Sequence, residues 1–196
     1  MTPAERYRQV AVLHAANIDQ GFLATLGVPF LALMYRALDE AEGSVLLTEE
    51  QDGRVVGFVS GGEGMGAIYR RMLRYPVRLG LSLLPSLARP KRPKRLKRIL
   101  EILRYSGGAS TGQDLPHAEL LSIAVDASVR GTGVAERLYR QLQAHFSQRG
   151  VGAFRIVVGD SLAPAHRYYQ KMGAKPTGRI EVHEGEGSVV YLQEIA

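Results

Sequence analysis

The stretch Val125-Asp126-Ala127-Ser128-Val129-Arg130-Gly131-Thr132-Gly133-Val134-Ala135 connects two segments of different character. The apolar run before it, residues 120–125, predicts a buried strand, and the amphipathic run after it, residues 134–149, predicts a helix. A loop of the form Arg-Gly-x-Gly leaves several backbone N–H groups free, and glycine lets a ligand approach the main chain closely. The positive end of the helix dipole also attracts anions. The stretch therefore predicts a turn that binds a diphosphate.

Upstream of this turn, the sequence predicts two helices and a hairpin. Thr2-Pro3-Ala4-Glu5 is a capping box with proline at the first helical position, so the first helix is expected to run to about Asn17. After a short helical turn, a second helix is predicted over residues 28–38, with an apolar face made of Phe30, Leu31, Met34, Tyr35 and Leu38. The β-rich runs 44–48 and 54–60 flank an aspartate–glycine turn and predict a hairpin.

Downstream of the turn, strands and helices alternate before a closing hairpin. The predicted elements are strand 119–125, helix 134–149, strand 153–158, helix 163–172, and strands 177–183 and 188–195. We expect an i, i+4 stripe of Val134, Leu138, Leu142 and Phe146 on the first of these helices, and Asp160 or Ser161 as the cap of the second. Because strand–helix–strand units need parallel neighbours and hairpins need antiparallel ones, the fold class is predicted to be mixed α/β.

Composition narrows the chemistry. The chain of 196 residues has the length of one domain, 1–196, with room for an insertion. It contains no cysteine, which excludes disulfides, thiolate metal ligands and a cysteine nucleophile. Its five histidines have no ligand spacing, so we predict no metal site. The longest uncharged apolar run, residues 79–88, is far shorter than the roughly 20 residues of a spanning helix, and we expect a cytoplasmic protein.

One segment carries the basic character of the chain. Residues 68–105 contain twelve Lys and Arg against one acid, a local charge of +11, whereas the whole chain has a net charge of +6 and the remainder is therefore −5. The segment is rich in proline and predicts short basic amphipathic helices, around 68–73 and 96–103. We treat residues 61–117 as an insertion within the domain, because they hold too few large apolar residues to form a core alone.

Two motifs identify a family. The loop is not a dinucleotide fingerprint, since the third glycine of that motif would be Glu136. Arg130-Gly131-Thr132-Gly133-Val134-Ala135 after the strand 119–125 instead resembles the acyl-CoA motif of the GNAT superfamily of N-acyltransferases, Arg/Gln-x-x-Gly-x-Gly/Ala. The run Ala165–Ala174 is similar to the Asn-x-x-Ala-x-x-x-Tyr-x-Lys-x-Gly-Phe helix of the same superfamily. The resemblance covers residues 118–196 well and residues 1–60 loosely.

The resemblance implies a GNAT-like fold, with a central mixed and mostly antiparallel sheet flanked by helices and a basic helical insertion after the second predicted strand. Three departures stand out. The usual first strand of the family is missing, so the sheet is expected to be one strand short or to be completed by another segment, and a homodimer is an open alternative. Leu162 replaces the asparagine of the helix motif, and Ala174 replaces its phenylalanine.

The resemblance also implies site residues for acetyl-CoA as cosubstrate. The pantetheine is expected to lie along the backbone of Ile123, Ala124 and Val125, and the diphosphate to meet the N–H groups of Arg130, Gly131, Thr132, Gly133, Val134 and Ala135. Tyr169 matches the tyrosine general acid of the family, whereas Tyr168 is expected to be a packed aromatic. Glu119 is the candidate base, with water or a solvated strand-end role as alternatives, and His117 is a weaker candidate.

The implied reaction is transfer of an acetyl group from acetyl-CoA to a primary amine by direct attack in a ternary complex. A small molecule, such as an amino sugar, is the favoured acceptor, and a protein or peptide amine is the alternative. The basic segment could be a solvated arm, could hold the 3′-phosphate of CoA or an anionic acceptor, or could contact nucleic acid or a membrane surface; we favour the acceptor role. The rival hypothesis is a non-catalytic module that binds nucleic acid or anionic lipid.

Overall fold

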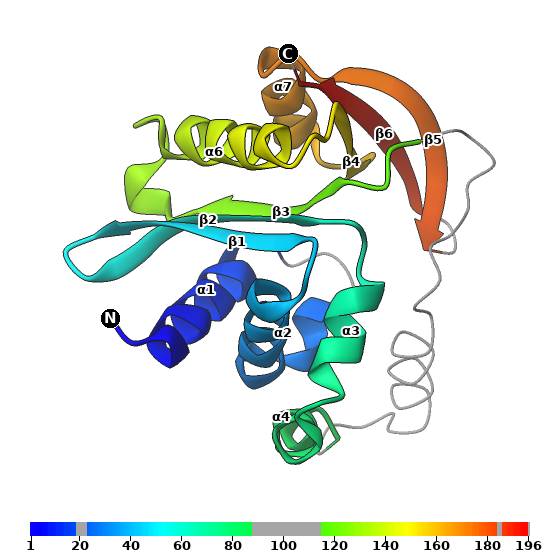
Figure 1. Ribbon diagram of the computed structural model, residues 1–196. Helices are drawn as coiled ribbons and strands as arrows, with labels where there is room; N and C mark the ends of the chain where they lie inside the picture. The colour runs from blue at the N-terminus through cyan, green and yellow to red at the C-terminus, as the bar shows by residue number, and fades with distance from the viewer. Residues whose placement is uncertain (19–22, 88–114, 184–185, 196) are drawn as a thin grey trace.

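The computed structural model describes residues 1–18, 23–87, 115–183 and 186–195 (Figure 1). Its elements, in chain order, are α1 (Pro3–Asn17), the 3-10 helix η1 (Leu23–Leu26), α2 (Val28–Glu40), β1 (Ser44–Gln51), β2 (Arg54–Gly62), α3 (Gly66–Met72), α4 (Pro76–Leu87), β3 (Glu119–Val125), the 3-10 helix η2 (Ala127–Val129), α6 (Val134–Gln148), β4 (Ala153–Gly159), α7 (Ala163–Lys171), β5 (Lys175–His183) and β6 (Glu186–Glu194).

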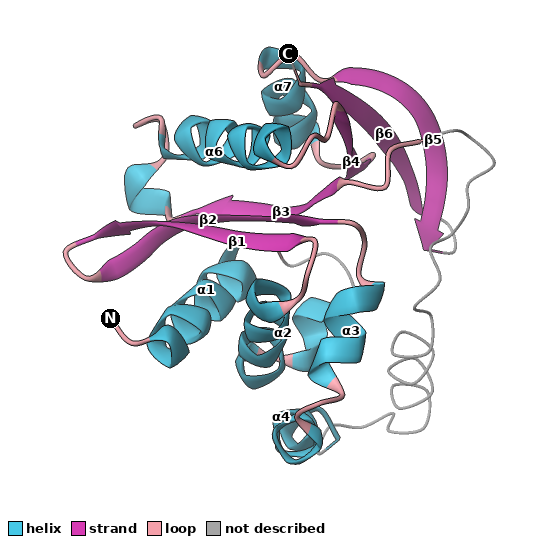
Figure 2. Cartoon of the chain, in the orientation of Figure 1, coloured by secondary structure: helices cyan, strands magenta, loops and turns pink. Residues whose placement is uncertain are grey.

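The strands form one sheet with the order β1-β2-β3-β4-β6-β5. All neighbours are antiparallel except β3 and β4, which are parallel. Helices α1 to α4 lie on one side of the sheet and α6 on the other (Figures 1 and 2). The predicted mixed and mostly antiparallel sheet flanked by helices is confirmed. Within the described residues, no strand precedes β1, so this sheet has six strands and β1 forms one edge.

The helical layer of α1 and α2 follows the predicted pattern. Thr2 caps α1, because its hydroxyl oxygen accepts a hydrogen bond from the backbone N–H of Glu5 at 3.2 Å. The predicted apolar face of α2 is fully in the core, where none of its five residues is more than 4% exposed. Burial of such a face, at roughly 1.5–3 kcal/mol per large side chain, is the main reason that a helix of this length stays folded.

On the opposite side, α6 packs directly on β2 through two glycines. The predicted stripe of Val134, Leu138, Leu142 and Phe146 is buried. A Cβ on Gly57 would come within 2.8 Å of Val134 and 2.9 Å of Leu138, and a Cβ on Gly61 within 2.7 Å of Leu142 and 2.9 Å of Phe146. The two glycines thus allow a close approach of helix and sheet that no larger residue permits.

The structure corrects two local expectations and shows a helix, α3, where one was predicted around residues 68–73. Gly61 and Gly62, predicted to open the insertion, are the last residues of β2, and Ile68, Tyr69 and Met72 of α3 are buried against α2 in the core. Leu73, expected on the apolar face of this helix, is 52% exposed because α3 has already ended. The predicted helix around 96–103 lies outside the described residues.

The predicted cap of α7 is also wrong. Leu162 precedes the helix and makes no capping hydrogen bond through its side chain. Asp160 is used elsewhere, because its carboxylate pairs with Arg179 of β5. Asp160, which local spacing predicted as a cap of α7, therefore forms a long-range ion pair instead.

Candidate functional site

The candidate site begins where β3 and β4 separate. The two strands pair only at the first two residues of β3, Glu119 with Arg155 and Leu120 with Ile156 of β4. Beyond this point β3 continues to pair with β2 but no longer with β4. The end of the β3–β4 pairing coincides with an irregularity in the β2–β3 register, which skips Leu121. A parallel pair that stops after two residues leaves an open edge along the rest of β3.

The direction of the backbone groups along this edge follows from one hydrogen bond. Asp126 donates its N–H to the carbonyl of Val56 on β2 at 2.8 Å. Because the groups of an antiparallel strand alternate in direction, Ala124 also pairs toward β2, whereas Ile123 and Val125 present their N–H and C=O groups toward the gap. Of the three predicted pantetheine contacts, Ile123 and Val125 therefore have free backbone groups at the open edge, and Ala124 does not.

The loop after β3 supplies the second part of the site. Gly131 and Gly133 have φ angles of +80° and +82°, in the left-handed region that favours glycine. Gly133 is the N-cap of α6 and leaves the first helical N–H groups, from Val134 onward, without side-chain acceptors. Thr132 donates its N–H to Val129, so its backbone is partly occupied, while its hydroxyl donates to the same carbonyl at 2.7 Å. The turn thus joins a positive helix end to the open edge of β3.

Arg130 lies exposed beside this turn. Its guanidinium donates to the side-chain oxygen of Asn17 at the end of α1 at 2.5 Å. At the start of the turn, Asp126 accepts from the N–H and the hydroxyl of Ser128 at 2.9 and 2.6 Å, which lowers the pKa of its carboxyl group. The N–H of Arg130 donates to the carbonyl of Ala127, so this group and that of Thr132 are occupied. Of the six predicted diphosphate contacts, the N–H groups of Gly131, Gly133, Val134 and Ala135 have no backbone acceptor among the described residues and remain available to a ligand.

Tyr169 differs from the aromatic residues around it. Its ring is 7% exposed and lies 5.3 Å from the ring of Tyr168, 6.1 Å from that of Tyr139 and 6.4 Å from that of Tyr191. The other three hydroxyls are hydrogen-bonded: Tyr168 donates to the carbonyl of Ala135 at 2.9 Å, Tyr139 donates to Gln193 at 2.9 Å, and Tyr191 contacts His166 at 2.8 Å. In the described part of the chain, only the Tyr169 hydroxyl of this group lacks a partner.

This hydroxyl is suited to proton donation. A buried tyrosine normally satisfies its O–H group, so an unpaired one points to a ligand. The Tyr169 hydroxyl is not fully enclosed, since Nε of Arg6 is the one fully enclosed side-chain polar atom without a partner among the described residues. Burial, reinforced by nearby Tyr168, raises the pKa of Tyr169 above its ordinary value. The group therefore holds its proton at neutral pH.

Glu119 lies at the closed end of the gap. Its carboxylate oxygen accepts from Nε and Nη2 of Arg155 at 2.9 and 2.8 Å, and the two side chains are partly exposed. Ion pairing on one oxygen leaves the other free to accept a proton. His117 lies exposed just before β3. The base role of Glu119 stays a prediction.

Residues 15–174 match the family model described as the acetyltransferase (GNAT) family. The chain belongs to the GNAT acetyltransferase family. Solved structures share the fold of this GNAT acetyltransferase at low sequence identity. Ard1 from Thermoplasma volcanium is 14% identical, with a TM-score of 0.61, and the match covers 100% of this chain and 95% of that one. No curated protein sequence is significantly similar to the chain.

Two further structures indicate the range of the fold. The ribosomal-protein-S18-alanine N-acetyltransferase from Escherichia coli is 13% identical, with a TM-score of 0.56, and the match covers 97% of this chain and 88% of that one. An aminoglycoside 6′-N-acetyltransferase, solved in complex with coenzyme A, is 12% identical, with a TM-score of 0.60 and coverage of 97% and 91%. These likenesses confirm the predicted GNAT fold, and the predicted membership of an N-acetyltransferase family is confirmed by the family match.

One series of hydrogen-bonded side chains in this GNAT acetyltransferase was not predicted from the sequence. Nδ1 of His14 lies 2.6 Å from the hydroxyl of Tyr35, which lies 3.0 Å from the hydroxyl of Ser122, which in turn lies 2.7 Å from that of Ser60. This series of hydrogen bonds links α1 and α2 to β2 and β3 just beyond the register irregularity. It therefore fixes β3 at the point where the gap opens. No local pattern reveals it, because its links join residues 21, 87 and 62 positions apart.

The GNAT acetyltransferase shows no cluster of three or more His, Cys, Asp or Glu side chains that could hold a metal ion, as far as the described ranges extend. The expectation that the protein needs no metal stays a prediction.

Proposed function

We propose that this protein transfers an acetyl group from acetyl-CoA to a primary amine by direct attack in a ternary complex. The observation that carries the proposal is the open edge of β3, which is followed, after the short 3-10 helix η2, by the turn of Gly131 and Gly133. An extended amide chain matches the first part and a diphosphate matches the second. These are the two parts of coenzyme A that a protein can bind through its main chain.

The residues at the open edge fit this cosubstrate. Ile123 and Val125 would hold the pantetheine through their backbone groups, and the N–H groups of Gly131, Gly133, Val134 and Ala135 would hold the diphosphate. Arg130 would add a charge-assisted contact to the phosphates after leaving Asn17. When bound, acetyl-CoA supplies an activated acyl group, whose transfer to an amine forms a C–N bond, breaks the C–S bond and requires one proton to leave the amine and one to reach the sulfur.

Tyr169 is the proposed proton donor. Its hydroxyl is protonated at neutral pH, has no competing partner in the described residues and lies on α7, which follows the diverging end of β4. A positioned general acid of this kind contributes roughly 10²- to 10⁴-fold to a rate. Tyr168 has a packing role, because its hydroxyl is already bound to the carbonyl of Ala135.

Glu119 is the proposed acceptor of the proton from the amine, directly or through a water molecule. Its position on β3, at the closed end of the gap, puts it on the same strand as the pantetheine contacts. The pairing with Arg155 orients the carboxylate. The chain contains no cysteine, so a thiol acyl-enzyme is excluded and direct transfer to the amine is favoured.

A small-molecule amine, such as an amino sugar, is the proposed acceptor class, and a protein or peptide amine is the alternative. Similar structures carry names of both kinds, an aminoglycoside acetyltransferase and a ribosomal-protein-alanine acetyltransferase. At these identities the names carry only the fold. The acceptor class therefore has to come from a direct assay.

The deciding experiment mixes the protein with acetyl-CoA and a panel of amino sugars, polyamines and peptides, and follows the release of free thiol. We expect release that depends on one class of amine, with intersecting initial-velocity lines typical of a ternary complex. Mass spectrometry then identifies the acetylated product. If acetyl-CoA causes no thermal shift and no amine supports release, the fold does not act as an acetyltransferase.

A further inference from the structure

Helix α4 exposes an unusual amount of apolar surface. Val77, Leu81 and Leu84 are 73%, 60% and 57% exposed, and Leu73 just before the helix is 52% exposed. These four make up most of the large exposed hydrophobic residues in the described ranges, where the others are Met1 and Val12. The spacing i, i+4, i+7 puts Val77, Leu81 and Leu84 on one face of the helix. The opposite face, with Leu79 and Leu83, is buried in the core.

The same region is purely basic. From residue 66 to residue 87 the sequence has four arginines and no acid. Arg71 pairs with Glu40, whereas Arg70, Arg74 and Arg78 are exposed and have no acidic partner among the residues that the structure describes. The seven Lys and Arg between residues 88 and 98, again without an acid, continue this charge in the sequence. An apolar face with only positive charge around it fits a surface that is both apolar and anionic.

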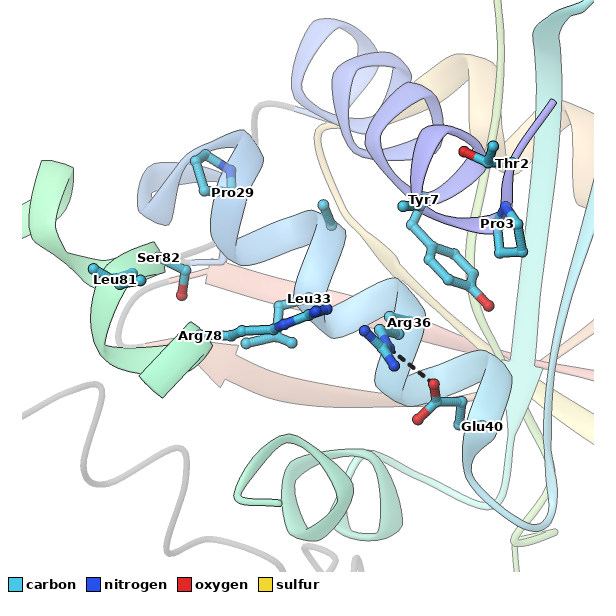
Figure 3. A pocket seen from close by; sticks show the side chains of 12 residues that line it. Thr2, Pro3, Tyr7, Pro29, Leu33, Arg36, Glu40, Arg78, Leu81 and Ser82 are labelled. Atoms are coloured by element: carbon cyan, nitrogen blue, oxygen red, sulfur yellow. Dashed lines mark hydrogen bonds and ion pairs between the residues drawn. The ribbon is translucent and has the colours of Figure 1, made fainter. Parts of the chain in front are cut away.

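A groove runs along the inner margin of α4, where it meets α1 and α2. Its volume is about 610 Å³, and its lining includes Pro29, Leu33, Arg36, Arg78 and Leu81. Figure 3 shows Arg78 reaching from α4 toward Leu33 of α2, with Leu81 on the same helix as Arg78. Arg36 is neutralised by Glu40 at 2.8 Å. Arg78 therefore places an uncompensated cation between aliphatic side chains at the groove.

We infer that the exposed apolar residues of α4, Val77, Leu81 and Leu84, dock on an anionic phospholipid surface together with Arg70 of α3, Arg74 between the two helices and Arg78 of α4. The aliphatic side chains would insert at the boundary between the lipid headgroups and the acyl chains, while the arginines would bind the phosphates. The attachment is peripheral, since none of the described helices has the length and apolar character needed to cross a bilayer. It would bring the acetyltransferase to acceptors at or near a membrane.

Two other partners fit the surface less well. Nucleic acid would use the arginines but would gain little from three exposed aliphatic side chains of α4. A second copy of the chain, related by a twofold axis, would bring Arg70, Arg74 and Arg78 against the same arginines of the other copy, and residues 66–87 supply no Asp or Glu to pair with them. Only a lipid surface uses both the apolar and the basic groups.

The test is co-sedimentation of the full chain with vesicles of phosphatidylcholine alone or mixed in equal parts with phosphatidylglycerol. We expect binding to the anionic vesicles to be about tenfold tighter or more. The variant V77S/L81S/L84S keeps the net charge, and R70Q/R74Q/R78Q keeps the apolar face. Each should weaken binding by about tenfold. The control R8Q/R140Q/R149Q removes three exposed arginines elsewhere and should retain most of the binding.

The melting temperature of each variant establishes that it is folded. Unchanged vesicle binding by V77S/L81S/L84S would overturn the inference, because charge alone would then suffice. Polynucleotide binding that exceeds vesicle binding and ignores this variant would point to nucleic acid instead. A dimer that dissociates in this variant, or a loss of its thermal stability without vesicle binding in the parent, would show that protein covers the face. None of these outcomes depends on the acetyl transfer itself.

Discussion

The region around the β3–β4 gap and the region around α4 are built from different parts of the chain's chemistry. The gap and its turn consist of main chain: open strand edges, helical N–H groups and two glycines with positive φ. The surface of α4 consists of aliphatic and basic side chains. A main-chain site admits few residues at its critical positions, whereas a side-chain surface admits many. The site for acetyl-CoA can therefore be predicted from the sequence more directly than the identity of the acceptor can.

The substitution Gly133→Glu tests the proposed main-chain site for acetyl-CoA most directly. The new side chain would force a left-handed conformation on a residue with a Cβ and place a carboxylate at the proposed diphosphate site. We expect acetyl-CoA binding to weaken by about a thousandfold, measured by titration calorimetry.

Gly53→Glu is the matched control for this variant. Gly53 also has a positive φ, +73°, and a Cβ added to it would meet nothing within 4 Å, but it belongs to the β1–β2 turn. It should bind acetyl-CoA like the parent protein. Equal weakening in both variants would mean that backbone strain, and not the position of the turn, causes the loss.

The next largest effect is expected for Tyr169→Phe. Removal of the one unpaired hydroxyl in its aromatic cluster should lower kcat about 10²- to 10³-fold with little change in the KM for acetyl-CoA. In Tyr168→Phe the bond to the carbonyl of Ala135 is lost instead. This variant should lose about 1 kcal/mol of stability in urea unfolding and keep most of its kcat. A reversed pattern would assign the acid role to Tyr168.

A smaller effect is expected from the series of hydrogen-bonded side chains that anchors β3. Burial lowers the pKa of His14 to about 4, below its ordinary value of 6.5. Between these values the unfolded chain binds more protons than the folded one, so stability is complete above pH 6.5 and is lost as the pH falls toward 4. The loss should approach about 2–3 kcal/mol. Urea unfolding of His14→Gln should show a flatter pH dependence over this range; an unchanged slope would assign the effect to other groups.

Sequence patterns predicted the elements that depend on near neighbours. Gly131 and Gly133 were predictable because their backbone conformation requires glycine, and the stripe from Val134 to Phe146 because helical periodicity displays it. The register irregularity at Leu121 and the bond of Tyr35 to Ser122 were not, since they depend on contacts between strands and helices far apart in the chain. The helix around 68–73 was predicted as amphipathic, but its packing against α2 was not, because that contact joins two segments far apart in the chain.

The smallest effect is expected for Glu119→Gln. Glu119 lies where β3 and β4 still pair, at the closed end of the gap. If Glu119 accepts the proton of the amine, this variant should lower kcat/KM about tenfold, because a water molecule can replace it in part, and should remove the acidic limb of the pH–rate profile. The ion pair with Arg155 is lost at the same time, so a structural loss has to be separated from a chemical one.

Arg155→Gln makes that separation. It breaks the same ion pair but leaves the carboxylate in place, so it should retain the acidic limb of the pH–rate profile. If both variants lose activity equally and both keep the acidic limb of the pH–rate profile, Glu119 serves only to hold β3 against β4. The proton would then leave the amine through water, and the catalytic side chains of the described gap would reduce to Tyr169 alone.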